Sequence, residues 1–295
     1  MPETFHFQAI DKVDRGGVIS RCSYIYEFSW GNNMYRESTV NNVDNVLMCT
    51  NTLNSVSFLG YKICDESYDR ILEYLRYSVF LYKKQVLIAF NPKKVAQANA
   101  DSNVCNALKD ADILIPDGFG IILASKMLGA KIKHRITGTD TVCRICDDPQ
   151  LSKAGIFIYG AEPDSLKDAI AKLSKKGVVI SGSENGYDLD DDNVISLINE
   201  SKAKILLVAL GSPKQELFIY RNKDKLKYVK LIMGVGGTID VISGHAKRAP
   251  AFIRKIGLEW VFRMICKPSR IKENKENISV YIKIVMKERR KKSGN

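Results

Sequence analysis

The chain has 295 residues, of which 45% are hydrophobic, so it can form one large or two small domains around a buried core. Its formal net charge is +12, and residues 245–295, with fifteen Lys and Arg against four Glu, contribute +11 of it. A nearly neutral body with a basic C-terminal segment predicts docking on a polyanion, which could be an anionic membrane, a nucleic acid or a diphosphate.

The sequence also argues against a transmembrane helix, a signal peptide, a disulfide framework and a metal site. No uninterrupted apolar run reaches about 18 residues, so no transmembrane helix is predicted. Residues 1–20 mix charged and apolar positions, which does not fit a signal peptide. The seven Cys are scattered and odd in number, which favours free thiols in a reducing cytoplasm. Cys143 and Cys146 form a lone Cys-x-x-Cys, which favours two thiols on a helix, and no metal site is predicted.

Residues 1–50 are predicted to form an N-terminal extension. They contain Asn-rich turns and only weak alternation of apolar and polar residues around residues 22–30. Three interpretations fit this pattern: a small hairpin, a loose arm, or an upstream segment outside the working fold. We therefore place the main domain at residues 51–244 and a basic C-terminal appendage at residues 245–295.

Short apolar strands alternate with helices from residue 55 onward. Strands are predicted over residues 56–59, 86–90, 113–115, 155–159, 178–180, 204–210 and 230–233. Helices are predicted over residues 67–81, 93–108, 120–128, 164–175, 193–200 and 213–220. This alternation predicts an α/β fold, with a mostly parallel, Rossmann-like sheet covered by helices on both faces.

Five loops follow the predicted strands, where ligands of such sheets bind. Glycine precedes a helix in three of them, and a helix N-terminus with free N–H groups suits an anion such as a nucleotide diphosphate. Tight packing is the alternative for each single loop. Neither a Gly-x-Gly-x-x-Gly nor a P-loop pattern is present. The five loops are Asn91-Pro92, Asp117-Gly118, Gly160–Pro163, Gly211–Glu216 and Gly234–Asp240.

Asp117 lies between Pro116 and Gly118 at a strand end. It is either a turn-forming residue or a general base that takes a proton from an attacking hydroxyl. Arg135 follows eighteen residues later and is suited to bidentate contact with phosphate oxygens.

Several motifs together resemble the WecG/TagA/CpsF glycosyltransferase family over about residues 55–272. The motifs are Pro116–Gly120, Arg135–Asp140, Tyr159–Pro163, Leu210–Glu216, Gly234–Asp240, Arg248–Arg254 and Gly257–Arg263. The resemblance implies transfer of a sugar, commonly N-acetylmannosamine, from its UDP conjugate to an undecaprenyl-diphosphate-linked acceptor sugar. Products of the family enter teichoic acid, enterobacterial common antigen, capsule or exopolysaccharide. The family often has Thr where this chain has Ala89, which leaves the substrate open.

The resemblance also implies roles for single residues. Asp117 corresponds to the proposed catalytic base, and Asn91, Arg135 and Gln215 to other pocket positions. Residues expected to bind the nucleotide sugar are Gly160, Ala161, Gly211, Ser212, Pro213, Gly234, Gly236, Gly237 and Asp240. We expect one inverting displacement, in which helix N-termini and Arg or Lys stabilise the leaving UDP, because no Asp-x-Asp motif accompanies the nucleotide loops. The acidic run 190–192 is interpreted as a helix N-cap. No cofactor is predicted.

The basic appendage is predicted to contain two amphipathic helices, over residues 251–266 and 277–290. Cations flanking Trp260 are typical of a helix that lies in a membrane interface, and a cytoplasmic location at the inner face of the membrane is expected. Ordinary packing of a terminal helix on the core is the alternative, and both could hold in different states. Residues expected to contact the acceptor diphosphate or membrane are Arg248, Arg254, Trp260, Arg263 and Arg270.

Two other functions fit parts of the sequence. A nucleic-acid-binding protein would explain the basic tail, but no nucleic-acid-binding motif is present and no such partner is expected. A nucleotide-sugar-binding protein without transferase activity would be compatible with Ala89. The predicted partners are a UDP-sugar, a polyprenyl-diphosphate-linked acceptor and an anionic membrane surface, and a homo-oligomer is left open.

Overall fold

The structure is a computed structural model that describes residues 6–13, 19–30, 33–35, 52–80, 83–187, 190–250, 253, 262 and 271–293. The chain divides into two compact units, Met1–Thr52 and Leu53–Asn295. The first unit contains an antiparallel sheet of β1 (His6–Val13), β2 (Ile19–Trp30) and β3 (Asn33–Tyr35). Of the three interpretations of this region, the hairpin matches these strands.

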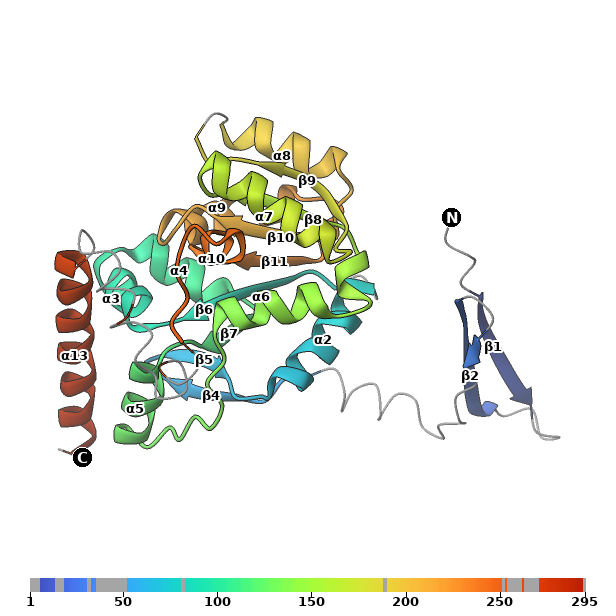
Figure 1. Ribbon diagram of the computed structural model, residues 1–295. Coiled ribbons are helices and arrows are strands. Elements are labelled where there is room, and N and C mark those ends of the chain that lie inside the picture. Colours follow the sequence, from blue (N-terminus) through green and yellow to red (C-terminus); the bar gives the residue numbers. More distant parts are fainter. Residues whose placement is uncertain are drawn as a thin grey trace. The chain divides into compact units, whose positions relative to one another are not determined.

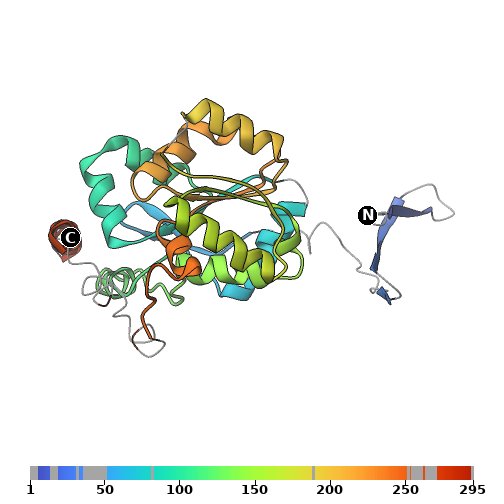
Figure 2. The same ribbon diagram turned by 45° about the horizontal axis from the view of Figure 1, so that its top comes forward.

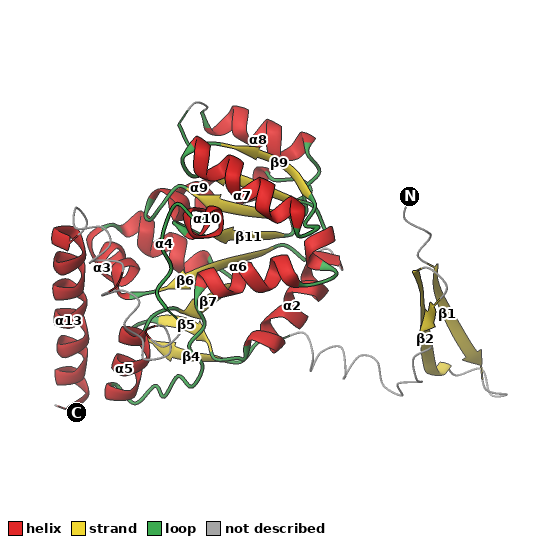
Figure 3. Ribbon diagram, viewed as in Figure 1, coloured by secondary structure: helices red, strands yellow, loops and turns green. Residues whose placement is uncertain are grey.

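The second unit is built on an eight-stranded sheet with the order β4-β5-β7-β6-β11-β10-β8-β9. Among these described strands, β4 and β5 pair antiparallel, and the remaining neighbours pair in parallel. Figure 3 shows the strands as one layer between helices. The strands are β4 (Ser55–Phe58), β5 (Tyr61–Cys64), β6 (Gln85–Phe90), β7 (Ile113–Pro116), β8 (Ile156–Gly160), β9 (Ile180–Glu184), β10 (Ile205–Ala209) and β11 (Leu231–Gly234).

Helices connect these strands and pack on both faces of the sheet (Figure 1). They are α2 (Tyr68–Phe80), α3 (Pro92–Ala100), α4 (Ser102–Asp110), α5 (Phe119–Met127), α6 (Gly138–Asp147), α7 (Pro163–Lys175), α8 (Asp191–Glu200), α9 (Lys214–Asn222), α10 (Thr238–Ser243) and α13 (Ile271–Ser293). Two short 3₁₀ helices lie at Leu151–Lys153 and Lys223–Lys225.

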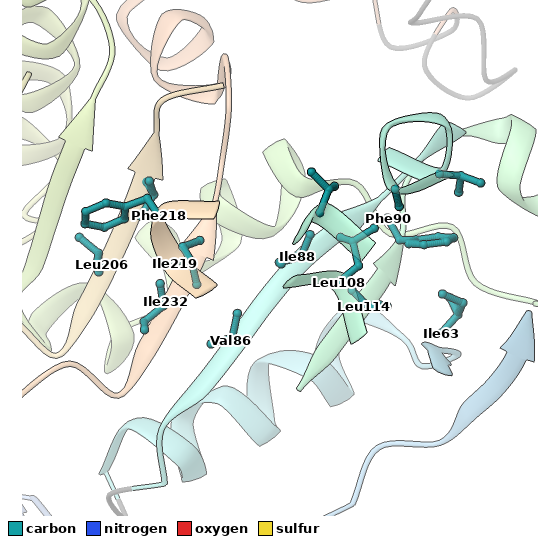
Figure 4. Close-up of a cluster of buried hydrophobic side chains, with 14 of the residues drawn as sticks. Ile63, Val86, Ile88, Phe90, Leu108, Leu114, Leu206, Phe218, Ile219 and Ile232 are labelled. Carbon is teal, nitrogen blue, oxygen red and sulfur yellow. The ribbon is translucent and has the colours of Figure 1, made fainter. Parts of the chain in front are cut away.

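Alternation along the central strands creates two apolar cores. Val86, Ile88 and Phe90 of β6 point into one core, which α3, α4, α5, α8, α9 and α13 cover. Leu87 and Ala89 point into the other core, which α2, α6, α7 and α10 cover. Figure 4 shows labelled members of the first core. The predicted α/β architecture with helices on both faces is therefore confirmed.

The local predictions were wrong in a few places. Residues 93–108 form two helices, because Asp101 leaves the helical conformation (φ −134°, ψ 117°) and its side chain caps α4. The strand predicted at 178–180 lies at Ile180–Glu184, a half-exposed strand at the sheet edge without a continuous apolar run. The sequence analysis also missed β5 and α10, and it gave no bounds for α6, although it expected Cys143 and Cys146 on a helix.

Two minor predictions hold. Cys143 and Cys146 are free thiols on α6, and Asp190 caps α8 by accepting a hydrogen bond from the Asn193 backbone N–H at 2.9 Å. Within the described part of the chain, no cluster of three or more His, Cys, Asp or Glu could hold a metal ion. None of the described helices is long and apolar enough to cross a membrane.

The C-terminal helix α13 packs against the sheet domain beside α3 and α5 (Figures 1 and 2). Tyr281 and Val285 are buried in the first core, and the Tyr281 hydroxyl donates to the Gly120 carbonyl at 3.0 Å. Lys292 Nζ donates to the Leu128 carbonyl at 2.8 Å. Packing on the core therefore describes this helix, although Ile282 is 53% exposed. The helix predicted over 251–266 lies outside the described residues apart from residues 253 and 262, as do Arg254, Trp260, Arg263 and Arg270.

We expect Tyr281→Phe to lower the free energy of unfolding by about 1 kcal/mol, because the half-buried Gly120 carbonyl loses its hydrogen-bond donor. Tyr228→Phe, at a tyrosine that is 46% exposed, is the matched control. Denaturant titration measures both variants. Equal unfolding midpoints for the two would show that the hydrogen bond does not anchor α13.

Candidate active site

The register of the sheet brings the five predicted loops into one row. Adjacent parallel strands align Phe90 with Pro116, Ile88 with Gly234, and Ala209 with Gly160. Because β10 also pairs in parallel with β11, the carboxyl ends of β7, β6, β11, β10 and β8 follow one another along the same edge. The sequence places the polar residues at strand ends, and the strand order makes those ends neighbours.

The loops after β6 and β7 are joined directly. The Asp117 backbone N–H donates to the Phe90 carbonyl at 2.8 Å. Asn91 caps α3, since its Oδ1 accepts from the Lys94 backbone N–H at 3.1 Å. Gly118 has φ +96°, a conformation that favours glycine, and α5 begins immediately after it. Half-buried Asp117 thus lies beside Asn91 at the start of a helix.

Arg135 is held close to the same strand end by tethers on both sides. The following residue, Ile136, donates its N–H to the Pro116 carbonyl at 3.1 Å. On the other side, Asp65 Oδ1 accepts from the backbone N–H groups of Lys133 at 2.8 Å and His134 at 2.9 Å, and lies 3.1 Å from His134 Nδ1. Arg135 therefore has a fixed backbone position next to the loop that carries Asp117.

Asp65 gives this tether a pH dependence. Its burial acts to raise the pKa, but the hydrogen bonds from His134 and Lys133 hold the pKa of Asp65 below its usual value. A carboxyl whose pKa is lower in the folded state stabilises the protein above its unfolded pKa of about 3.9, and this stabilisation is lost as pH falls through the folded value.

We expect Asp65→Asn to lower the free energy of unfolding by about 2 kcal/mol at pH 7, because the donors lose a charged acceptor. The difference from the wild type should begin to shrink as pH falls below about 3.9, and it should disappear once pH has fallen through the lower pKa of the folded state. Asp190→Asn is the control, since asparagine caps a helix as well as aspartate. Denaturant titration across pH measures both, and a pH-independent difference would contradict the prediction.

Tyr68 belongs to this region although the sequence analysis treated it only as a helix residue. Its hydroxyl accepts the Thr137 backbone N–H at 2.9 Å. Burial raises the pKa of Tyr68, the hydrogen bonds with Thr137 oppose the rise, and the charges of Asp140 and Asp117 add to it. The hydroxyl therefore lies within electrostatic range of both carboxylates. No local signal could have found it, because Tyr68 and Thr137 are 69 residues apart.

Helix α6 begins at this point because Thr137 caps it. Thr137 Oγ1 accepts the Asp140 backbone N–H at 3.2 Å and donates to Asp140 Oδ2 at 2.8 Å. Asp140 also forms an ion pair with Arg248. Arg248 was expected to contact the acceptor diphosphate, and in this structure its guanidinium binds the first turn of α6, so the diphosphate contact stays a prediction.

The loops after β10 and β11 are joined through Gln215, which is 1% exposed. Gln215 Oε1 accepts the Gly236 backbone N–H at 2.9 Å, and Nε2 donates to Glu216 Oε1 at 2.7 Å. Ser212 Oγ donates to Gln97 Oε1 of α3 at 2.7 Å. The Gln215 amide, predicted as a pocket group, therefore joins two candidate nucleotide loops, and its contact with a substrate stays a prediction.

Comparison with known proteins identifies the family. The sequence model of the "Glycosyl transferase WecG/TagA/CpsF family" matches residues 56–295. The chain belongs to this family. It is similar to the N-acetylglucosaminyldiphosphoundecaprenol N-acetyl-beta-D-mannosaminyltransferases of Bacillus spizizenii, with 31% identity over 210 residues, and of Bacillus subtilis strain 168, with 32% identity over 209 residues. Each alignment covers 70% of this chain and 81% of the relative.

In this family member, the loop after β8 is the last of the five strand-end loops along the sheet edge. A Cβ on Gly160 would lie 2.6 Å from the Ala209 carbonyl carbon, so only glycine allows β8 this close to β10. Ala161 follows with φ +70° and donates its N–H to the Ala209 carbonyl at 3.2 Å. Both residues were expected to bind the nucleotide sugar; the structure shows the backbone closely packed there, and the contact with a substrate stays a prediction.

The sequence analysis assigned no role to Tyr187 or to Glu162, which lies in the loop after β8. The Tyr187 hydroxyl donates to Glu162 Oε1 at 2.6 Å. This hydrogen bond raises the pKa of Tyr187, burial adds to the rise, and so do the charges of Glu162 and Asp240. The charge of Asp240, on α10, therefore acts on this pair.

Proposed function

We propose that this glycosyltransferase moves N-acetylmannosamine from its UDP conjugate to N-acetylglucosaminyl-diphosphoundecaprenol. The observation that supports it is the row of five strand-end loops, with Asp117, Asn91 and Arg135 at one end and glycine turns at the other. The printed names of both relatives supply the acceptor and the sugar. UDP as the carrier follows from the glycine turns and the family resemblance.

The proposed reaction is a single displacement. Asp117 takes the proton from an acceptor hydroxyl, the hydroxyl oxygen bonds to the anomeric carbon of N-acetylmannosamine, and the bond from that carbon to UDP breaks with inversion. The UDP leaving group carries away the electron pair. In this proposal, Arg135 and the N-terminus of α9 stabilise the negative charge on its diphosphate. Asn91 positions a sugar or phosphate through its amide nitrogen, since its oxygen caps α3.

The sugar carried by the UDP donor is assigned from the relatives, because Ala89 departs from the residue that the family often has. Ala89, where the family often has Thr, is 5% exposed and packs where α6 begins, since a Cβ on Gly138 would lie 3.2 Å from that of Ala89. A threonine hydroxyl is thus missing behind the Asn91 loop. We still assign N-acetylmannosamine, because both relatives carry that name and each aligns with this chain over 81% of its own length.

We further propose that residues 245–295 dock the enzyme on the cytoplasmic face of the membrane, where the lipid-linked acceptor lies. The net charge of +11 in this segment supports the assignment. Residues 51–244 would then form the catalytic domain and residues 1–50 a separate extension.

The test is a transfer assay with N-acetylglucosaminyl-diphospholipid acceptor and three donors: UDP-N-acetylmannosamine, UDP-N-acetylglucosamine and UDP-glucose. We expect acceptor-dependent UDP release and a disaccharide product with the first donor only. Product from another donor would overturn the sugar assignment. Binding of UDP without product from any donor would favour a nucleotide-sugar-binding protein that does not catalyse transfer.

A further inference from the structure

A buried ion pair joins the first turns of α3 and α9, the helices that follow the loops after β6 and β10. Lys94 Nζ of α3 is 3.2 Å from Glu216 Oε1 of α9, and the two side chains are 6% and 0% exposed. Burying two charges is costly, and replacing such a pair by apolar residues is often neutral or stabilising. Stability alone therefore does not explain why this ion pair is buried next to the candidate site.

The pair belongs to a chain of hydrogen bonds that crosses three neighbouring loops. Asn91 Oδ1 accepts the Lys94 backbone N–H at 3.1 Å, while Lys94 Nζ binds Glu216. Glu216 Oε1 accepts Gln215 Nε2 at 2.7 Å, and Gln215 Oε1 accepts the Gly236 N–H at 2.9 Å. The chain thus joins the loops after β6, β10 and β11.

The acceptor-only chemistry of a carboxylate fixes how the Gln215 amide points. An ionised Glu216 cannot donate, so the Gln215 NH₂ group must face it and the Gln215 oxygen must face Gly236. In the described part of the chain, Glu216 Oε2 has no hydrogen-bond partner, so both donors bind Oε1. The amide also packs closely on the glycine turn, since a Cβ on Gly234 would lie 2.8 Å from Gln215 Nε2.

We propose that Lys94 and Glu216 are positioning residues that hold the Gly234–Gly237 turn in the shape that binds the donor diphosphate. Glu216 sets the direction of the Gln215 amide, and that amide holds Gly236 at its left-handed φ of +51°. Lys94 neutralises the buried carboxylate and, through its backbone, joins the turn to Asn91. The link to the diphosphate rests on the proposed function, whereas the link to the turn does not.

The test compares two double variants that differ at residue 216 in whether the side chain can accept a hydrogen bond. Both remove the buried charges: Lys94→Met with Glu216→Gln, and Lys94→Met with Glu216→Leu. Glutamine can still accept from Gln215 Nε2, and leucine cannot. If the ion pair contributed only to stability, the two double variants would show the same hydrogen exchange at Gly236 and the same affinity for UDP. Melting temperature is measured for both, and all other readings are taken well below it.

The first reading is hydrogen exchange of the peptide that contains Gly236, measured by mass spectrometry on protein without ligand. We expect at least tenfold faster exchange in the leucine variant than in the glutamine variant. The second reading is the dissociation constant for UDP, which we expect to be at least tenfold higher in the leucine variant. In transfer assays, KM for the donor should rise more than kcat falls.

Equal exchange at Gly236 in the two variants would overturn the positioning role. Faster exchange with unchanged UDP affinity would overturn its connection to the donor. If the wild type binds no UDP, the proposed donor is wrong, and the exchange measurement still decides the role of the pair. Glu216→Gln and Glu216→Met with Lys94 retained repeat the same comparison if the Lys94→Met substitution prevents folding.

Discussion

Asp117→Asn should lower kcat by about 10²–10⁴-fold and leave the dissociation constant for UDP unchanged. The substitution keeps the shape of the side chain and the backbone hydrogen bond from Asp117 to the Phe90 carbonyl. It removes only the ability to accept a proton from the acceptor hydroxyl. Single-turnover transfer and UDP titration measure the two effects separately.

The matched control for this variant is Asp164→Asn, an exposed aspartate in the first turn of α7. It makes the same chemical change away from the loops after β6 and β7, and its turnover should equal that of the wild type. If Asp117→Asn keeps wild-type turnover as well, Asp117 is a turn residue, which is the alternative that the sequence left open. A loss of UDP affinity equal to the loss of turnover would place Asp117 in binding.

The row of loops could be predicted from the sequence because its signals are local. Short apolar strands such as Val86–Phe90 and Ile205–Ala209 are followed at once by Asn91 or by glycine, and parallel strands must end at one edge. The strand order that makes Asp117 and Gly234 near neighbours across β6 is a property of the whole sheet. The loops that form the row were therefore predictable, and which loops are neighbours was not.

The contacts that the sequence analysis missed join residues that are distant in the chain. Tyr68 meets Thr137 from 69 residues away, and Arg248 meets Asp140 from 108 residues away. The contacts of Tyr68 and Arg248 are tertiary, so no periodicity or motif records them. The bounds of α6 were missed for a different reason: its first turn, Gly138 to Asp140, is polar, and its start depends on the local Thr137 cap, which was not read as a helix start.

The helix near the C-terminus shows a different limit. Its apolar stripe predicts either a membrane face or a core face, since amphipathic patterns are the same for both. The structure resolves this for Tyr281 and Val285, which are buried against the sheet domain. A deletion of residues 245–295 would therefore uncover core residues as well as remove charge, and it cannot test membrane docking by itself.

Charge reversal on the exposed side of α13 is a cleaner test of docking. Lys283, Lys287 and Arg290 are exposed and lie on the side of the helix opposite Tyr281. Reversing all three to Glu should weaken binding to anionic vesicles by at least about 100-fold, because each basic residue near such a surface contributes about 1 kcal/mol. Vesicle co-sedimentation at several salt concentrations measures the loss, which should be greatest at low salt.

The matched control reverses three exposed lysines elsewhere: Lys167 and Lys175 on α7, and Lys227. It makes the same change in net charge, so a loss shared by both triple variants would show that overall charge, and not α13, attracts the protein to the membrane. Full binding by the α13 variant would contradict docking through this helix and leave residues 251–270 as the docking segment. Tyr281 keeps its hydrogen bond to Gly120 in the α13 variant, so the helix should stay packed on the sheet domain. Turnover with a short-chain, water-soluble acceptor should then stay at the wild-type level. This measurement separates membrane docking from catalysis.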